Sequence, residues 1–122
     1  MTVTIAELIG KKDEIRAKKN AVYELETSIG DIIVKLPTSK IVADSWAIKN
    51  TMDANCFIIQ SCVLEPNLND KKLLEEFGVF DSIDVVREIF QVGEIPAIAS
   101  KLLNLAGFGE DINSKVHKDI KN

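Results

Sequence analysis

Residues 21–36 constrain the fold more than any other stretch of the chain. The segment "AVYELETSIGDIIVKLP" contains two β-rich runs, 21–27 and 31–36, separated by Ser28-Ile29-Gly30. Side chains alternate in character along the first run, as in a strand with one buried face. Gly30 can adopt the positive φ angle that a tight hairpin connection requires. We therefore predict an antiparallel β-hairpin at about residues 21–36.

The segment before the hairpin carries helical spacing. Thr4 and Glu7 fit a capping box, and a narrow apolar stripe then continues to about Lys19. The same segment is rich in basic residues, which acidic residues interrupt and with which no aromatic residues alternate. This pattern favours a solvated helix face over a nucleic-acid patch. The basic residues are Lys11, Lys12, Arg16, Lys18 and Lys19.

Two further helices are predicted after the hairpin. The first begins at Thr38 or Ser39 and keeps its apolar spacing as far as Met52. The next segment, 54–64, is too apolar for its periodicity to distinguish a buried helix from a strand. Its length and a cap at Asp53 favour a helix, but the strand alternative stays open.

The stretch "CVLEPNLNDKKLLEEFG", residues 62–78, predicts a corner between two helices. Pro66 is expected to end the first helix, Asn69 or Asp70 to cap a short second one, and Gly78 to terminate it. Three apolar side chains are expected to pack inward at this corner: Leu68, Leu73 and Phe77.

The remainder of the chain predicts two more helices and a weak end. Asp81 or Ser82 opens the first helix, Pro96 lies in the first turn of the second, and Gly107 stops it. Residues 110–122 carry only a narrow apolar stripe. Such a stripe is typical of a weak helix that frays or that docks onto another surface. The expected fold is α+β: a mainly α-helical single domain, 1–122, with one N-terminal hairpin and a weakly ordered C-terminal tail, 110–122.

Composition excludes several classes of function. The chain has 122 residues, 46% of them hydrophobic, and a net charge of −4, whereas a nucleic-acid binder usually carries a basic face. No apolar run approaches the roughly 20 residues that cross a bilayer, and the N-terminus lacks the features of a secretory signal. Cys56 and Cys62 lie too far apart in a helix or strand to form a disulfide with each other. Two free, buried cysteines are typical of a protein in a reducing compartment. We expect a cytosolic protein that binds neither nucleic acid nor membrane.

The inventory of reactive residues argues against an enzyme. The single histidine, His117, lies in the weakly patterned tail, where it cannot be positioned for a catalytic triad. One histidine and two badly spaced cysteines do not make a zinc site, and no phosphate-binding loop is present. We predict no catalytic residue, no metal and no cofactor. A small hydrolase would need two carboxylates that converge in a pocket.

Five features occur in order along the chain: the start "TIAELIGKKDEI", the tyrosine-containing hairpin, the turn Glu65-Pro66-Asn67-Leu68, the Gly93-Glu94-Ile95 before the last main helix, and the closing "NLAGF". Because it has these features in this order, the chain resembles the XkdN-like family of phage tail assembly chaperones, over roughly residues 3–122. The resemblance implies a non-enzymatic role in building the tail of a bacteriophage or prophage.

The resemblance also implies partners and a location. Such a protein would bind the tape measure protein, a long helical chain, in the host bacterial cytoplasm, and would help tail tube subunits assemble around it. It would be absent from the mature virion. Self-association is open. The alternative is a small prophage-encoded regulatory or adaptor protein that binds a host factor; a neighbouring tape measure gene would distinguish the two.

A helical chaperone can cover the apolar stripe of such a partner with a surface of its own. The residues that we expect to contribute are large apolar or acidic ones at the ends of predicted elements. They are Trp46, Glu65, Pro66, Leu68, Glu75, Glu76, Phe77 and Phe80.

Overall fold

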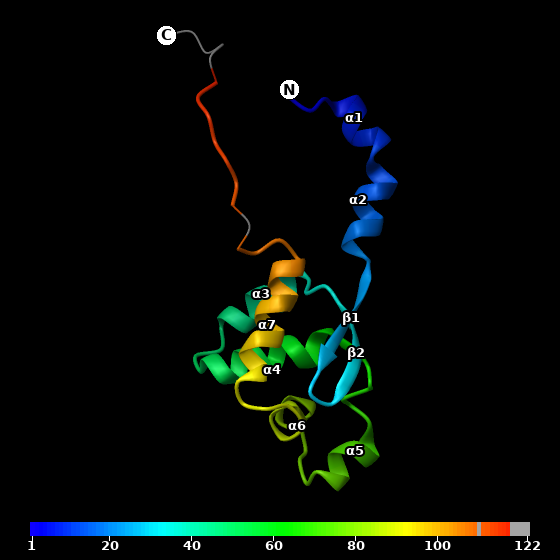
Figure 1. Ribbon diagram of the computed structural model, residues 1–122, viewed down its shortest axis with the longest axis vertical. Coiled ribbons are helices and arrows are strands. Elements are labelled where there is room, and N and C mark those ends of the chain that lie inside the picture. Colours follow the sequence, from blue (N-terminus) through cyan, green and yellow to red (C-terminus); the bar gives the residue numbers. More distant parts are fainter. Residues whose placement is uncertain (110, 118–122) are drawn as a thin grey trace.

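The computed structural model describes residues 1–109 and 111–117 (Figure 1). These residues form seven helices and three strands. In chain order, they are α1 (Ile5–Gly10), α2 (Lys12–Lys19), β1 (Val22–Thr27), β2 (Gly30–Lys35), α3 (Ser39–Trp46), α4 (Thr51–Cys62), β3 (Val63–Glu65), α5 (Lys71–Glu76), α6 (Ser82–Ile89) and α7 (Glu94–Leu105). The predicted α+β class is confirmed.

The three strands form one antiparallel sheet in the order β1-β2-β3. The predicted hairpin is present as β1 and β2, which Ser28 and Ile29 join. Thr27 and Gly30, on either side of this turn, are register partners. Gly30 has φ +119°, the conformation that its position requires. The inward face of the hairpin carries Ile32 and Val34, both fully buried. β1 is left as a free edge of the sheet.

The third strand was not predicted. The helix expected over 54–64 ends at Cys62, and Val63 begins β3 by pairing with Val34 of β2. The strand also separates this helix from Pro66, so Pro66 does not end it. A continuous apolar run is compatible with a helix or a strand. Here the edge of β2 that β1 does not occupy is available for pairing, so the end of the run forms a strand.

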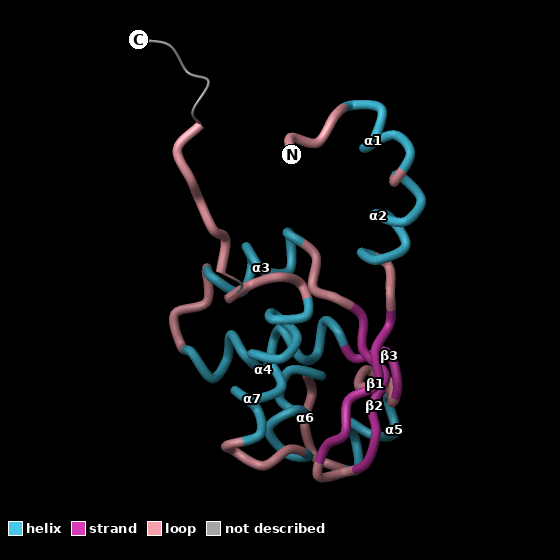
Figure 2. The backbone as a smooth tube through the Cα atoms, turned by 45° about the horizontal axis from the view of Figure 1, so that its top comes forward, coloured by secondary structure: helices cyan, strands magenta, loops and turns pink. Residues whose placement is uncertain are grey.

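Helix α4 lies at the centre of the helical layer, which packs on one side of the sheet (Figure 2). It contacts α3, α6 and α7 and buries Ile58 and Ile59. Around these side chains the core is completed by Ile32, Val34, Cys56, Cys62, Val63, Leu68, Val85, Val86, Phe90, Ile95, Ile98, Ala99 and Leu102.

The boundary between α3 and α4 differs from the prediction. α3 ends at Trp46, well before Met52, and Asn50 caps α4 by accepting a hydrogen bond from the Asp53 N–H at 3.0 Å. Asp53 is therefore inside the helix rather than its cap. Its carboxylate instead forms an ion pair with Arg87 of α6.

Helices α1 and α2 form an N-terminal arm, residues 5–19, that projects beyond the body of the molecule (Figures 1 and 2). Thr4 caps the arm as predicted, with its hydroxyl oxygen accepting from the Glu7 N–H at 3.2 Å. The predicted single helix is interrupted at Lys11. Neither helix contains a buried residue.

The predicted tail has no regular structure where it is described. Residues 111–117 form neither helix nor strand, and Ile112 and Val116 are exposed. Residues 110 and 118–122 of that tail lie outside the described residues. In the part of the chain that the structure describes, no helix is both long and apolar enough to cross a membrane.

Candidate partner-binding surfaces

The short helix α5 positions the first candidate surface. Asp70 caps it by accepting from the Leu73 N–H at 3.0 Å, and Gly78 ends it with φ +67°. Leu73 and Leu74 pack against the core. The charged residues of α5 are exposed, as are Phe77 and Phe80 after it.

A hollow of about 480 Å³ lies beside α5. It is lined by Lys71, Leu74, Glu75, Gly78, Val79 and Phe80. We call it the α5 hollow. Phe80 is fully exposed, and full burial of such a side chain would be worth about 1.5–3 kcal/mol. An exposed phenyl ring beside an apolar hollow is typical of a contact surface.

The structure brings four of the predicted residues to this surface. Glu75 and Phe80 line the hollow, and the neighbouring Glu76 and Phe77 are exposed. The prediction that Phe77 packs inward is wrong, because 42% of its surface is exposed.

The other predicted residues lie elsewhere. Glu65 and Pro66 are exposed at the end of β3, whereas Leu68 is only 2% exposed and belongs to the core. Trp46 is 73% exposed at the end of α3 and packs edge-to-face against Phe108, with 6.2 Å between ring centroids. Helices α3 and α5 lie at opposite ends of the body (Figure 1), so Trp46 is not part of the α5 hollow.

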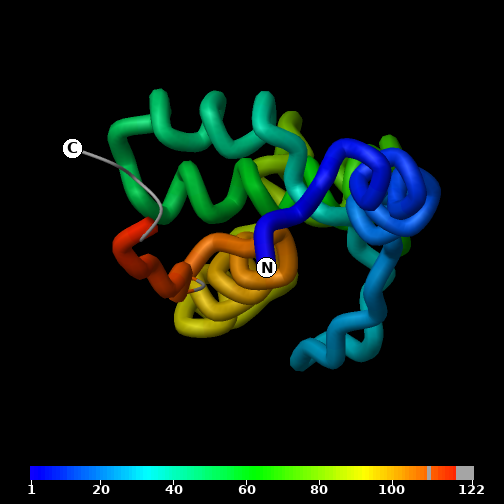
Figure 3. The backbone as a smooth tube through the Cα atoms, turned by 90° about the horizontal axis from the view of Figure 1, so that it is seen from above, coloured from blue at the N-terminus to red at the C-terminus, as the bar shows by residue number. Residues whose placement is uncertain are grey.

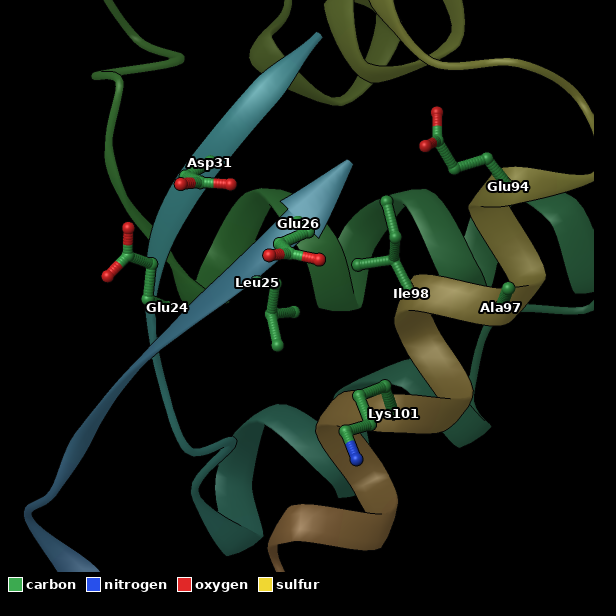
Figure 4. A pocket seen from close by; sticks show the side chains of 8 residues that line it. All are labelled: Glu24, Leu25, Glu26, Asp31, Glu94, Ala97, Ile98 and Lys101. Carbon is green, nitrogen blue, oxygen red and sulfur yellow. The ribbon is translucent and has the colours of Figure 1, made fainter. Parts of the chain in front are cut away.

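A second candidate surface was not predicted. A groove of about 720 Å³ lies between the hairpin and α7. Its apolar lining is Leu25, Ala97 and Ile98, and its charged lining is Glu24, Glu26, Asp31, Glu94 and Lys101 (Figure 4). We call it the acidic groove. The alternation of Glu24 and Glu26 along β1 was visible in the sequence, but their approach to α7 was not.

The carboxylates of the acidic groove bear on the hydrolase alternative. Glu94 accepts hydrogen bonds from the Ser28 hydroxyl and the Ser28 N–H, and these bonds lower the pKa of its carboxyl group. A general acid needs a raised pKa, so this carboxylate is suited to binding positive charge rather than to donating a proton. Among the described residues, no three His, Cys, Asp or Glu side chains are grouped as a metal site would require.

Comparison with known protein families resolves the class of protein. A family model described as phage XkdN-like tail assembly chaperone protein matches residues 48–121. The chain belongs to this family. The match to the XkdN-like chaperones includes α4 to α7 and hence the α5 hollow. It leaves out the N-terminal arm and the hairpin, so the start of the chain carries no part of the family match. Searches of curated proteins and of solved structures return no match.

Proposed function

We propose that this chain is a non-catalytic chaperone that binds the tape measure protein in the host bacterial cytoplasm during tail assembly. In this role it keeps a long helical chain soluble until tail tube subunits assemble around it, and it is absent from the mature virion. Membership of the XkdN-like family supports the role in tail assembly. The observation that carries the choice of surface is Phe80, fully exposed beside the α5 hollow within the family-matched segment.

The chemistry of the α5 hollow suits an amphipathic helix. Leu74 and Val79 offer an apolar lining, while Lys71 and Glu75 can contact polar residues beside the apolar stripe of the partner. The hollow is small compared with a permanent interface. A chaperone must release its partner, and a modest contact with one or two anchoring side chains allows that release.

The test is co-expression with the tape measure protein of the same phage or prophage, followed by affinity pull-down and size-exclusion chromatography. The wild type is compared with Phe80→Ser and with the control Val92→Ser, which replaces another exposed apolar residue outside the hollow. An anchoring role predicts at least about tenfold weaker binding for Phe80→Ser and wild-type binding for the control. Both variants should retain the wild-type melting temperature.

Two outcomes would overturn the proposal. Equal recovery of the tape measure protein with wild type and Phe80→Ser would exclude the α5 hollow as the binding surface. A folded wild-type protein that elutes alone, beside an insoluble or unbound tape measure protein, would reject tape measure binding. The regulatory or adaptor alternative would then be favoured.

A further inference from the structure

One side of β1 is an unpaired edge of the sheet. The strand order β1-β2-β3 gives β1 a neighbouring strand on one side only, among the residues that the structure describes. In an antiparallel pair, every second residue directs its backbone N–H and C=O groups to the partner strand, and the residues between direct theirs away. β1 pairs with β2 along all six of its residues, so about half of its backbone groups point outward. Such a row of unpaired groups is a template for another strand.

The N-terminal arm does not lie along this edge. Figures 1 and 3 show α1 and α2 leaving from the start of β1 and leading away from the hairpin. Seen from above in Figure 3, the hairpin turn lies on the side away from the arm. The turn is held in place by α7, where the Glu94 carboxylate accepts hydrogen bonds from Ser28. A partner would therefore meet an edge that is already ordered, which lowers the cost of binding.

The acidic groove lies beside this edge. Three consecutive residues of β1, 24–26, line the groove, whereas β2 contributes Asp31 alone. The opposite wall is α7, with Ala97, Ile98 and Lys101 (Figure 4). A strand that is added to a sheet edge gains affinity from main-chain hydrogen bonds and specificity from recesses that take alternate side chains. The edge of β1 offers the first, and the groove offers the second.

The side chains of β1 specify the chemistry of that added strand. Exposed and half-buried residues alternate, so Glu24 and Glu26 lie on the exposed face and Leu25 lies on the other. Glu26 and Asp31 are register partners, which places two like charges opposite each other. Within residues 1–109 and 111–117, neither Glu24, Glu26 nor Asp31 takes part in an ion pair. A complementary strand therefore carries lysine or arginine at every second position and apolar side chains between them.

The same charges disfavour pairing between the β1 edges of two copies. Such a pair would bring Glu24 and Glu26 of both copies together on one face, and like charges across a strand pair are destabilising. The other edge strand, β3, has only three residues and ends in Glu65, so it does not supply the basic residues either. The occupant that fits is a different protein with the opposite charge.

We propose that β1 is a docking edge for an extended, basic segment of a partner protein, which adds to the sheet as a fourth strand beside the acidic groove. The six residues of β1 match a partner segment of about six residues, roughly 20 Å long. Basic side chains of the segment pair with Glu24 and Glu26, and its apolar side chains cover Leu25 and Ile98. This surface is separate from the α5 hollow, so its failure would leave tape measure binding at the hollow unaffected.

The probe that tests the charges is a synthetic peptide of four lysines alternating with three valines, acetylated and amidated at its ends. Fluorescence anisotropy of a labelled peptide, titrated with the purified full chain, gives the dissociation constant. Glu24→Lys with Glu26→Lys should weaken binding at least about tenfold. Glu14→Lys with Glu88→Lys makes the same change of charge at exposed residues outside the groove, and should weaken binding less than about threefold. Circular dichroism confirms that both variants are folded.

Backbone pairing is tested on the wild-type protein. With the peptide bound, nuclear magnetic resonance should show alternate amides of β1 exchanging with solvent at least about tenfold more slowly, because they are then hydrogen-bonded. The same peptide with N-methyl groups on its central residues lacks the donors for pairing and should bind at least about tenfold more weakly.

Three results would overturn the proposal. The first is no binding of the unmethylated peptide to the wild type. The second is equal binding of that peptide to the wild type and to Glu24→Lys with Glu26→Lys. The third is unchanged exchange along β1, or equal binding of the methylated peptide, since either would mean that no strand is added to the edge.

Discussion

The Glu94 carboxylate accepts two hydrogen bonds from Ser28, one from the backbone N–H at 2.7 Å and one from the hydroxyl at 2.6 Å. The two residues are 66 positions apart, so this contact fastens the hairpin turn to the first turn of α7. It closes one end of the acidic groove. The Gln91 N–H adds a weaker bond to the same carboxylate at 3.3 Å.

Replacement of Glu94 by Gln should make the free energy of unfolding less dependent on pH in the acidic range. The Ser28 hydroxyl bond is the largest cause of the lowered Glu94 pKa, and the backbone bonds from Ser28 and Gln91 act in the same direction. The ordinary pKa of a glutamate is near 4.5, and a carboxylate whose pKa is lowered in the folded protein stabilises the fold at pH values above 4.5. This contribution is lost as the pH falls through the lowered pKa. Denaturant unfolding should show Glu94→Gln about 1 kcal/mol less stable at neutral pH.

The difference between the two proteins should shrink as the pH falls below 4.5. Glu88→Gln is a suitable control, because Glu88 is exposed and enters no hydrogen bond or ion pair with another described side chain. A constant difference between wild type and Glu94→Gln at all values of pH would contradict the assignment.

Both cysteines should resist thiol reagents while the protein is folded. Cys56 and Cys62 are fully buried in α4, and burial raises the pKa of Cys62 to about 11 and also raises the pKa of Cys56. The thiolate is the reactive species, so neither group should react at about pH 8 until the chain opens. Labelling followed by mass spectrometry should find no modified thiol in the folded protein and two in denaturant. Labelling of the folded protein at the rate of a free thiol would refute this.

Leu102→Ala should strongly destabilise the fold. Leu102 is fully buried where α7 packs on α4, and loss of a buried leucine side chain costs about 2–5 kcal/mol. The neighbouring exposed residue Lys101 provides the control, since Lys101→Ala should change stability by no more than about 0.5 kcal/mol. Thermal and denaturant unfolding distinguish the two. Equal stability of the two variants would mean that α7 does not pack as described.

Exposed acidic residues on α5 and at the end of β3 should affect how fast a basic partner binds. Glu65, Glu75 and Glu76 are exposed, and complementary charge raises association rates more than affinity. Reversal of all three to lysine should slow association with the tape measure protein and reduce its dependence on salt, as measured by stopped-flow binding. Unchanged rates and unchanged salt dependence would remove any electrostatic role for these residues.

Signals that depend on a few neighbouring residues could be predicted from the sequence. The cap at Thr4 and the stop at Gly78 were predicted, and the caps at Thr38 and Asp70 were each one of two predicted alternatives, because a cap needs only one side chain and the N–H groups next to it. The hairpin followed from alternation and Gly30. Such local features place many element ends but not all of them, since Asp53, predicted as a cap, lies inside α4, which Asn50 caps.

Features that depend on distant residues could not be predicted. β3 exists because Val63 meets the edge of β2, and the acidic groove exists because residues 24–31 lie beside residues 94–101. The exposure of Phe77 depends on how α5 is tilted against the core. In each case the sequence supplied the residues, but their neighbours come from segments far away along the chain.

The pairing of Val34 with Val63 has a consequence for protein engineering. Val63 lies inside the family-matched segment, 48–121, whereas Val34 lies before it. A chimera that imports this segment from a relative would bring its own third strand but keep the hairpin of this chain. The graft should therefore be tolerated only where the imported strand fits against Ile33 and Val34, and an exchange that begins before residue 22 would avoid the mismatch.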